Sequence, residues 1–259
     1  MFRRITLAVS LLLMVCSMGY AQNKADDVRL FQTYFQDAPV SEVVVGEGFF
    51  QYGTSDFGSA INISVQSLFA ATPKLQVGAG LSFESQNPDK DKFGPNAKGE
   101  SGITDLTVAG YYQVMPGATP ISVGALLTLP IGSEDIGEGT FDFTFFGSLR
   151  HNTPSGLAIT GTFGIDFVEV EGVNPFTGAK DSNRETSVLI AGGVIYPLPS
   201  GLNILGELNI KTEGDYMLLT GGLDYALKSG GRIRGGIGIG LDDGAPDFAL
   251  RFGYAMSFH

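Results

Sequence analysis

The chain ends in a stretch, residues 247–259, that reads DFALRFGYAMSFH. Successive side chains of a β-strand point to opposite faces, so this stretch separates into two alternating sets of residues. One face carries Phe248, Leu250, Phe252, Tyr254, Met256 and Phe258. The other face carries Ala249, Arg251, Gly253, Ala255 and Ser257. A wholly apolar face opposite a small and charged one suits lipid outside and water inside, which is the arrangement of a transmembrane β-barrel.

The last residues also resemble the C-terminal aromatic signal by which bacterial outer-membrane proteins are delivered to the barrel-assembly machinery. Phe258 would be the signal residue, displaced by one position because His259 follows it. We therefore expect the bacterial outer membrane as the location of the protein, and outer-membrane lipid and the assembly machinery as its partners.

The N-terminus predicts export. Arg3 and Arg4 form a positive segment, residues 5–15 are largely apolar, and Ala21 ends a cleavage site of the small-residue kind. We expect residues 1–21 to be a cleaved signal peptide. An uncleaved anchor is an alternative, but residues 5–15 are too few to span a bilayer as a helix. A second alternative is lipidation at Cys16. The valine at position 15 disfavours it, because lipidation motifs have a small residue directly before the cysteine.

Composition narrows the class of protein. Cys16 is the only cysteine, so a mature chain would have neither disulfides nor thiolate metal sites. The net charge of −11 becomes −13 without Arg3 and Arg4, which argues against nucleic acid as a partner. Glycine provides 37 of 259 residues, far above the ~7% background, and barrels use glycine in turns and strand bends.

Alternation of apolar residues predicts strands along the whole mature chain. The expected strands are residues 42–53, 60–70, 74–84, 102–114, 121–131, 140–151, 156–168, 185–196, 201–212, 215–228, 232–241 and 247–258. Short connections alternate with longer ones at residues 85–101, 132–139 and 169–184. Outer-membrane barrels have short periplasmic turns and longer extracellular loops. We therefore expect an all-β fold, a single antiparallel transmembrane barrel of about twelve strands at residues 42–259, with both termini periplasmic.

Four tyrosines support this orientation. Tyr112, Tyr196, Tyr225 and Tyr254 each fall on the apolar face, close to a predicted short turn. We expect them to form an interfacial girdle at the membrane surface. A soluble β-sandwich is the alternative fold, but its strands are usually shorter and its outer faces polar.

Residues 22–41 show neither clean alternation nor a clear helical pattern. They could form a loose periplasmic extension, a short helix in the barrel mouth, or a partial plug.

The predicted inward face supplies candidate residues for a solute path. They are Asp105, Asp142, Asp166, Glu207, Asp224, Arg232, Arg234 and Arg251. These ions could brace the wall in pairs, and Asp224 is expected near enough to Arg234 to pair. Alternatively, the arginines could shape the passage of a solute with an anionic or polar end.

The sequence offers little support for a catalytic or cofactor site. We therefore expect that the protein is not an enzyme and has no catalytic residue, cofactor or metal. His151 lies at a predicted turn and His259 at the terminus, whereas a barrel lipase needs a histidine beside a serine on the outer face. The glycines of residues 235–240 alternate with isoleucine along a strand, so they do not form a nucleotide fingerprint. Asp242, Asp243 and Asp247 share a turn but lack the spacing of a calcium loop.

Two neighbouring strands resemble a known family. Residues 102–108 read GITDLTV, residues 126–132 read LLTLPIG, and residues 36–39 read QDAP. They are similar to motifs of the transporter family labelled meta-pathway of phenol degradation, with Asp105 and Pro130 carrying the match. The resemblance implies an outer-membrane channel for passive passage of small solutes, with hydrophobic or aromatic compounds favoured. The alternative is a structural or surface-interaction barrel with a closed lumen. The solute itself is not predicted.

Overall fold

The structure is a computed structural model that describes residues 28–137, 139–173, 180–228 and 230–258. The expected signal peptide at residues 1–21 lies outside these ranges, and so do residues 22–27. Among the helices of the described residues, none is long and apolar enough to cross a membrane.

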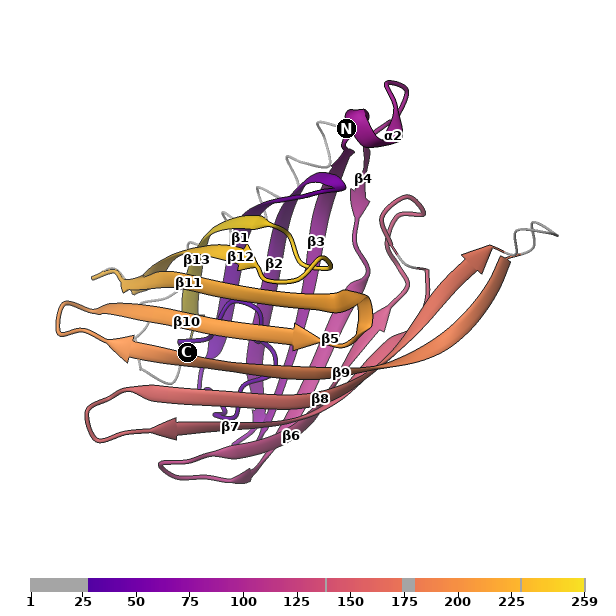
Figure 1. Ribbon diagram of the computed structural model, residues 1–259. Helices are drawn as coiled ribbons and strands as arrows, with labels where there is room; N and C mark the ends of the chain where they lie inside the picture. Colours follow the sequence, from indigo (N-terminus) through magenta and orange to yellow (C-terminus); the bar gives the residue numbers. More distant parts are fainter. Residues whose placement is uncertain (1–27, 138, 174–179, 229, 259) are drawn as a thin grey trace.

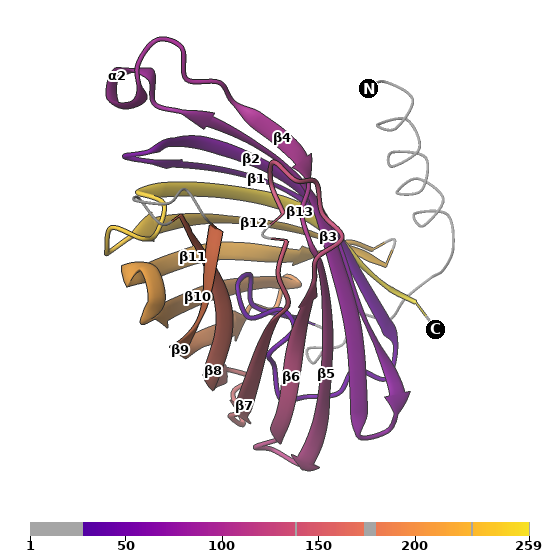
Figure 2. The same cartoon turned by 90° about the vertical axis from the view of Figure 1, so that its right-hand side faces the viewer.

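The described residues form one closed antiparallel β-barrel (Figures 1 and 2). The strands are β1 (Val44–Ser55), β2 (Gly58–Thr72), β3 (Leu75–Pro88), β4 (Glu100–Ile103), β5 (Leu106–Met115), β6 (Ile121–Leu129), β7 (Asp142–Asn152), β8 (Ala158–Val173), β9 (Lys180–Pro197), β10 (Leu202–Lys211), β11 (Tyr216–Ala226), β12 (Gly231–Gly240) and β13 (Phe248–Phe258). Two short helices, α2 (Lys90–Phe93) and η2 (Glu213–Asp215), lie in connections.

The barrel has twelve wall strands because β4 and β5 both pair with β3 and together form one strand, interrupted at residues 104–105. Each strand pairs with its neighbours in sequence, and β1 pairs with β13 to close the ring. Closure leaves no sheet edge, which a barrel in lipid requires because no water is present to satisfy exposed backbone groups. The predicted fold class is confirmed.

One predicted loop is wrong in its bounds. Residues 169–184 were expected to connect two strands, but β8 continues to Val173 and β9 begins at Lys180, with residues 169–173 paired to residues 180–184. Residues 168–171 alternate valine with glutamate, which is a strand pattern that the acidic composition disguised. The paired ends project from the barrel as a long hairpin (Figure 1). Residues 174–179 at its tip lie outside the described ranges.

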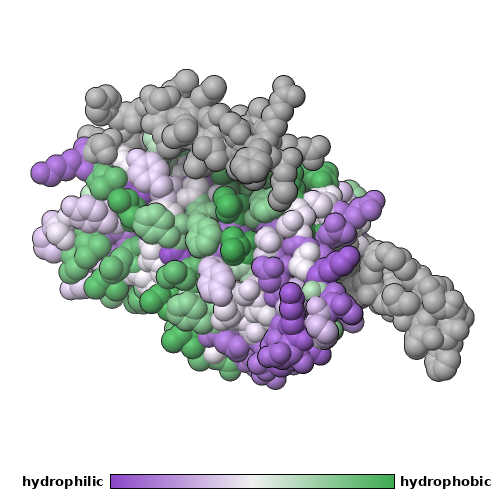
Figure 3. Space-filling model, turned by 90° about the horizontal axis from the view of Figure 1, so that it is seen from above, coloured by the Kyte–Doolittle hydropathy of each residue, from purple (hydrophilic) through white to green (hydrophobic). Residues whose placement is uncertain are grey.

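The outer face of the barrel is apolar. Exposed fractions reach 56% for Phe163, 50% for Ile237 and 59% for Phe252, while the residues next to them in each strand are buried or glycine. Figure 3 shows apolar side chains along the flank and hydrophilic ones gathered toward one end. Large apolar side chains exposed in strand after strand suit contact with hydrocarbon rather than with water.

Residues 28–41, which we call the inner segment, lie inside the ring of strands (Figures 1 and 2). Val28, Tyr34 and Ala38 are at most 2% exposed. The segment makes a turn, with the Gln36 amide donating to the Thr33 carbonyl at 2.9 Å, and none of its residues is helical. Its apolar side chains build two clusters with the wall, one around Phe31 and one around Tyr34.

We name the two ends of the barrel by their connections. The turn end carries the short turns between β2 and β3, β5 and β6, β7 and β8, β9 and β10, and β11 and β12. The loop end carries α2, the connection between β6 and β7, and the β8–β9 hairpin. Pro130 directly follows β6, where its missing amide donor ends the strand at the loop end.

Candidate functional site

The inner segment is held in the lumen by one carboxylate from β10. Both oxygens of Glu207 are used: Oε2 accepts from the amides of Phe31 and Gln32, each at 2.9 Å, and Oε1 accepts from the amide of Thr33 at 2.9 Å. The Thr33 hydroxyl donates to Oε1 at 2.8 Å. Successive backbone amides that converge on one anion form a nest, and hydrogen bonds to a charged acceptor are stronger than neutral ones. Glu207 therefore fixes the middle of the segment.

A connected group of ions also contacts Phe31. Arg234 of β12 contacts Asp224 at 3.1 Å and Glu47 at 2.8 Å, and Glu47 also contacts Arg251 of β13 at 3.3 Å. Arg251 donates to the Phe31 carbonyl at 3.0 Å, and the guanidinium carbons of Arg234 and Arg251 lie 4.8 and 5.5 Å from the Phe31 ring centroid. The ions thus contact the segment through both its backbone and an aromatic face.

A second ionic group joins the segment to β7. Asp37 contacts Arg29 at 2.9 Å within the segment and Arg150 of β7 at 2.7 Å. Arg150 also donates to the Val28 carbonyl at 2.7 Å. All three ionised side chains are at most 5% exposed, and each charge is paired, as a buried charge must be.

Neutral wall residues bind further backbone carbonyls of the inner segment. Ser122 donates to Ala38 at 2.5 Å, Ser148 to Gln36 at 2.6 Å, and Tyr111 to Pro39 at 2.9 Å. Tyr34 of the segment donates to the Val45 carbonyl at 3.2 Å. Burial raises the pKa of Tyr34, which lies outside the strands, so its hydroxyl stays a neutral donor.

Glycines in the wall make room for the aromatic side chains of the segment. A Cβ at Gly236 would lie 3.0 Å from a ring carbon of Phe31, and one at Gly222 only 2.5 Å from the same ring. Phe35 lies in the same way against Gly78 and Gly80. A Cβ added at these glycines would lie 3.0 and 3.1 Å from a ring carbon of Phe35. The inward glycine at position 236 leaves space in the lumen, and Phe31 fills that space.

All eight predicted path residues lie at inward positions and are at most 9% exposed. The structure brings together Asp224, Arg232 and Arg234, and Glu47 links them to Arg251. Asp224 is directly opposite Arg234 in the β11–β12 register, and the expected ion pair is present.

The other predicted path residues are spread around the wall. Asp166 contacts Lys211 at 3.6 Å. Asp105, in the interruption between β4 and β5, accepts from the Gly132 amide at 2.7 Å and so holds the β6–β7 connection. Asp142, which is 8% exposed, begins β7.

Sequence reasoning missed three buried ions: Glu47, Arg29 and Asp37. Glu47 could have been found, because a charge within a lipid-facing barrel strand belongs on the inner face. The other two lie in a segment without periodicity, so the sequence pattern gave no face to assign them to.

Outside the lumen, the four tyrosines of the expected girdle lie near one end of the barrel. Tyr112, Tyr196 and Tyr225 are 46%, 47% and 43% exposed, and Tyr254 is half-buried. Each is close to the turn end, and Tyr225 and Tyr254 flank the same residue of β12. Phe258 is the last residue of β13.

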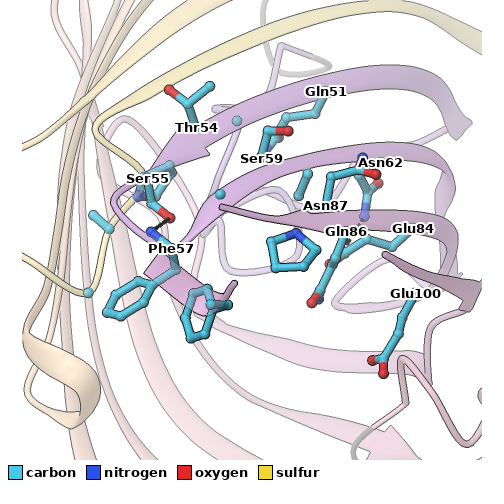
Figure 4. Close-up of a pocket in the computed structure, with 18 of the residues that line it drawn as sticks. Gln51, Thr54, Ser55, Phe57, Ser59, Asn62, Glu84, Gln86, Asn87 and Glu100 are labelled. Atoms are coloured by element: carbon cyan, nitrogen blue, oxygen red, sulfur yellow. Dashed lines mark hydrogen bonds between the residues drawn. The ribbon is translucent and has the colours of Figure 1, made fainter. Parts of the chain in front are cut away.

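A cavity of about 620 Å³ opens at the loop end and a smaller one of about 270 Å³ at the turn end. The larger is lined by the ends of β1, β2 and β3 and by residues 243–246 (Figure 4). The smaller is lined in part by Pro39 and Val40 of the inner segment.

Comparisons with known proteins agree with this fold. No family model matches the sequence, and no curated protein matches it. An outer-membrane channel from Pseudomonas putida F1 is similar in structure, with 14% identity and a TM-score of 0.72 over 89% of this chain and 100% of that one. The NanC porin has 13% identity and a TM-score of 0.55 over 83% and 99%. The KdgM porin has 14% identity and a TM-score of 0.53 over 82% and 99%.

These neighbours are channels and porins rather than enzymes, and the likeness is one of fold. The fold and the apolar outer face together place the chain among the β-barrels of the bacterial outer membrane.

Proposed function

We propose that the protein is an outer-membrane channel for the passive passage of small solutes, and that the inner segment closes its lumen in this conformation as a plug. One observation carries the proposal. The two cavities lie at opposite ends of the barrel, and the contacts of Glu207, Arg234 and Arg251 hold the inner segment between them. A path through the barrel exists when the segment moves, and its wall is polar or charged.

The turn end would face the periplasm and the loop end the exterior, as in other barrels of this kind. The resemblance of residues 102–108 and 126–132 to the phenol-degradation transporter family supports hydrophobic or aromatic solutes. Asp105 has a structural role in this structure, because it binds the Gly132 amide, so the motif alone does not select a solute.

The contacts of the inner segment favour a second candidate, a structural or surface-interaction barrel whose lumen stays closed. Conductance in planar bilayers separates the two. We expect small, infrequent openings from the mature chain and a steady, larger conductance after deletion of residues 22–41. Arg234 and Arg251 keep Glu47 and Asp224 as partners in the deletion variant, so the wall is expected to fold. Absence of conductance from a correctly inserted deletion variant would support the structural barrel.

A further inference from the structure

The cavity at the loop end has the size of a small-molecule site. Its volume of about 620 Å³ falls within the range of ~300–1,000 Å³ for ligand pockets. It lies on the inward side of β1, β2 and β3, next to the hairpin between β1 and β2, and the inner segment contributes none of its lining. A solute arriving from the loop end would meet this cavity before it meets the segment.

The polar lining includes four amide side chains, and two of them orient a carboxylate. Glu84 accepts from Asn62 at 3.1 Å and from Gln86 at 2.7 Å, one bond to each oxygen. Figure 4 shows these three side chains grouped with Asn87 on one side of the cavity. An amide presents both donors and an acceptor, so the group offers both kinds of hydrogen bond to one ligand.

The polar surface continues from the cavity toward the inner segment. Below Asn62, the hydroxyls of Ser64 and Ser82 lie 2.6 Å apart across β2 and β3. Further on, Gln66 donates to Glu47 at 2.8 Å, and Glu47 belongs to the ionic group that contacts the segment. Inward positions of β2 thus carry a row of hydroxyl and amide groups that can replace the hydration of a moving solute one contact at a time.

Two aromatic rings face the same cavity. Phe57 in the β1–β2 hairpin is 63% exposed, and Phe93 at the end of α2 is 56% exposed. The Asp89 amide donates to the Phe57 carbonyl at 2.9 Å, and Lys92 contacts Asp56 at 3.1 Å, so α2 is held against the hairpin. Large apolar rings exposed at a polar cavity suit a ligand that has both an apolar face and a polar edge.

We propose that this cavity binds a neutral, polyhydroxylated solute of the carbohydrate type. A sugar ring presents an apolar C–H face to an aromatic ring and a hydroxyl edge to amides and carboxylates. Glu84, Glu100 and Asp243 outnumber Lys98 in the lining, so an anionic solute is disfavoured. The inference names a solute class other than the hydrophobic or aromatic compounds that the family resemblance implies, and only the passage of that solute rests on the proposed function.

Calorimetric titration of the purified full chain in detergent, with maltotriose as the probe, tests the site without requiring transport. We expect saturable binding that Asn62→Leu and Gln86→Leu each weaken by about fivefold, the effect of one lost hydrogen bond. Phe57→Ser should weaken it to a similar extent. Asn152→Leu, which changes an amide at the turn end, is the matched control and should leave the affinity unchanged.

Three results would overturn the inference: no saturable binding of maltotriose to the folded protein, equal weakening by the control variant, or binding of catechol or gluconate in preference to maltotriose. Binding without conductance after deletion of residues 22–41 would instead support the site while contradicting the proposed channel, so the two failures are distinguishable.

Discussion

At the scale of single residues, the buried arginines of β12 and β13 are paired with carboxylates. Arg232, Arg234 and Arg251 have carboxylate partners in the structure, and two of them also contact the inner segment. Removing one member of a buried pair costs ~3–5 kcal/mol because the other charge is left uncompensated. These contacts favour the bracing role for the arginines over a role as free charges along a solute path.

Glu207 is the residue whose replacement should free the inner segment most directly. In Glu207→Gln, the amide nitrogen of the new side chain would face at least one backbone donor and the negative charge would be lost, so we expect loss of at least one of the four hydrogen bonds, weakening of the others, and a fall of roughly 2–4 kcal/mol in the free energy of unfolding. Conductance in planar bilayers should rise toward that of the deletion variant. Asp166→Asn is the control, because Asp166 is a buried inward carboxylate whose partner is Lys211 rather than the segment. Equal conductance in the two variants would mean that Glu207 does not hold the segment.

At the scale of elements, the strands could be predicted from sequence and the inner segment could not. In a strand such as β13, every second side chain faces lipid and is apolar, so the strand shows as alternation in the sequence. The inner segment is held chiefly through its backbone, by side chains from strands far away in sequence. Backbone contacts leave no periodicity in the residues that make them, which is why residues 22–41 allowed three interpretations.

The fit between the inner segment and the glycines of the wall can be tested by replacing Gly236 and Phe31 singly and together. Gly236→Val would place side-chain carbons within the volume of the Phe31 ring and should displace the segment, at a cost of ~1–3 kcal/mol. Phe31→Ala in the same chain should restore much of the lost stability, because it removes the ring that the valine meets. Chemical denaturation of the four proteins of this double-mutant cycle gives the coupling energy.

Gly221→Val is the matched control for that cycle, since a Cβ at this exposed glycine meets nothing within 4 Å. Additive effects of Gly236→Val and Phe31→Ala would contradict the fit.

At the scale of the whole molecule, closure of the barrel follows from one pairing, that of β1 with β13. The register joins Val44 to Phe258 and continues to Thr54 and Phe248, so the chain's first and last strands are paired over almost their full length. Any break in this seam would expose two strand edges to hydrocarbon, where unpaired backbone groups cost several kcal/mol each.

The seam therefore predicts how the protein migrates on a gel. A closed barrel resists detergent at room temperature, so we expect the unheated protein, extracted from outer membranes, to migrate differently from the boiled protein. Phe50→Pro, in the middle of the seam opposite Phe252, removes a backbone donor and should abolish this heat-dependent shift. Phe50→Ala removes the same outward ring but leaves the backbone intact, and should retain the shift. Recovery of the wild-type chain in the soluble periplasmic fraction, or a shift that survives Phe50→Pro unchanged, would contradict closure through β1 and β13.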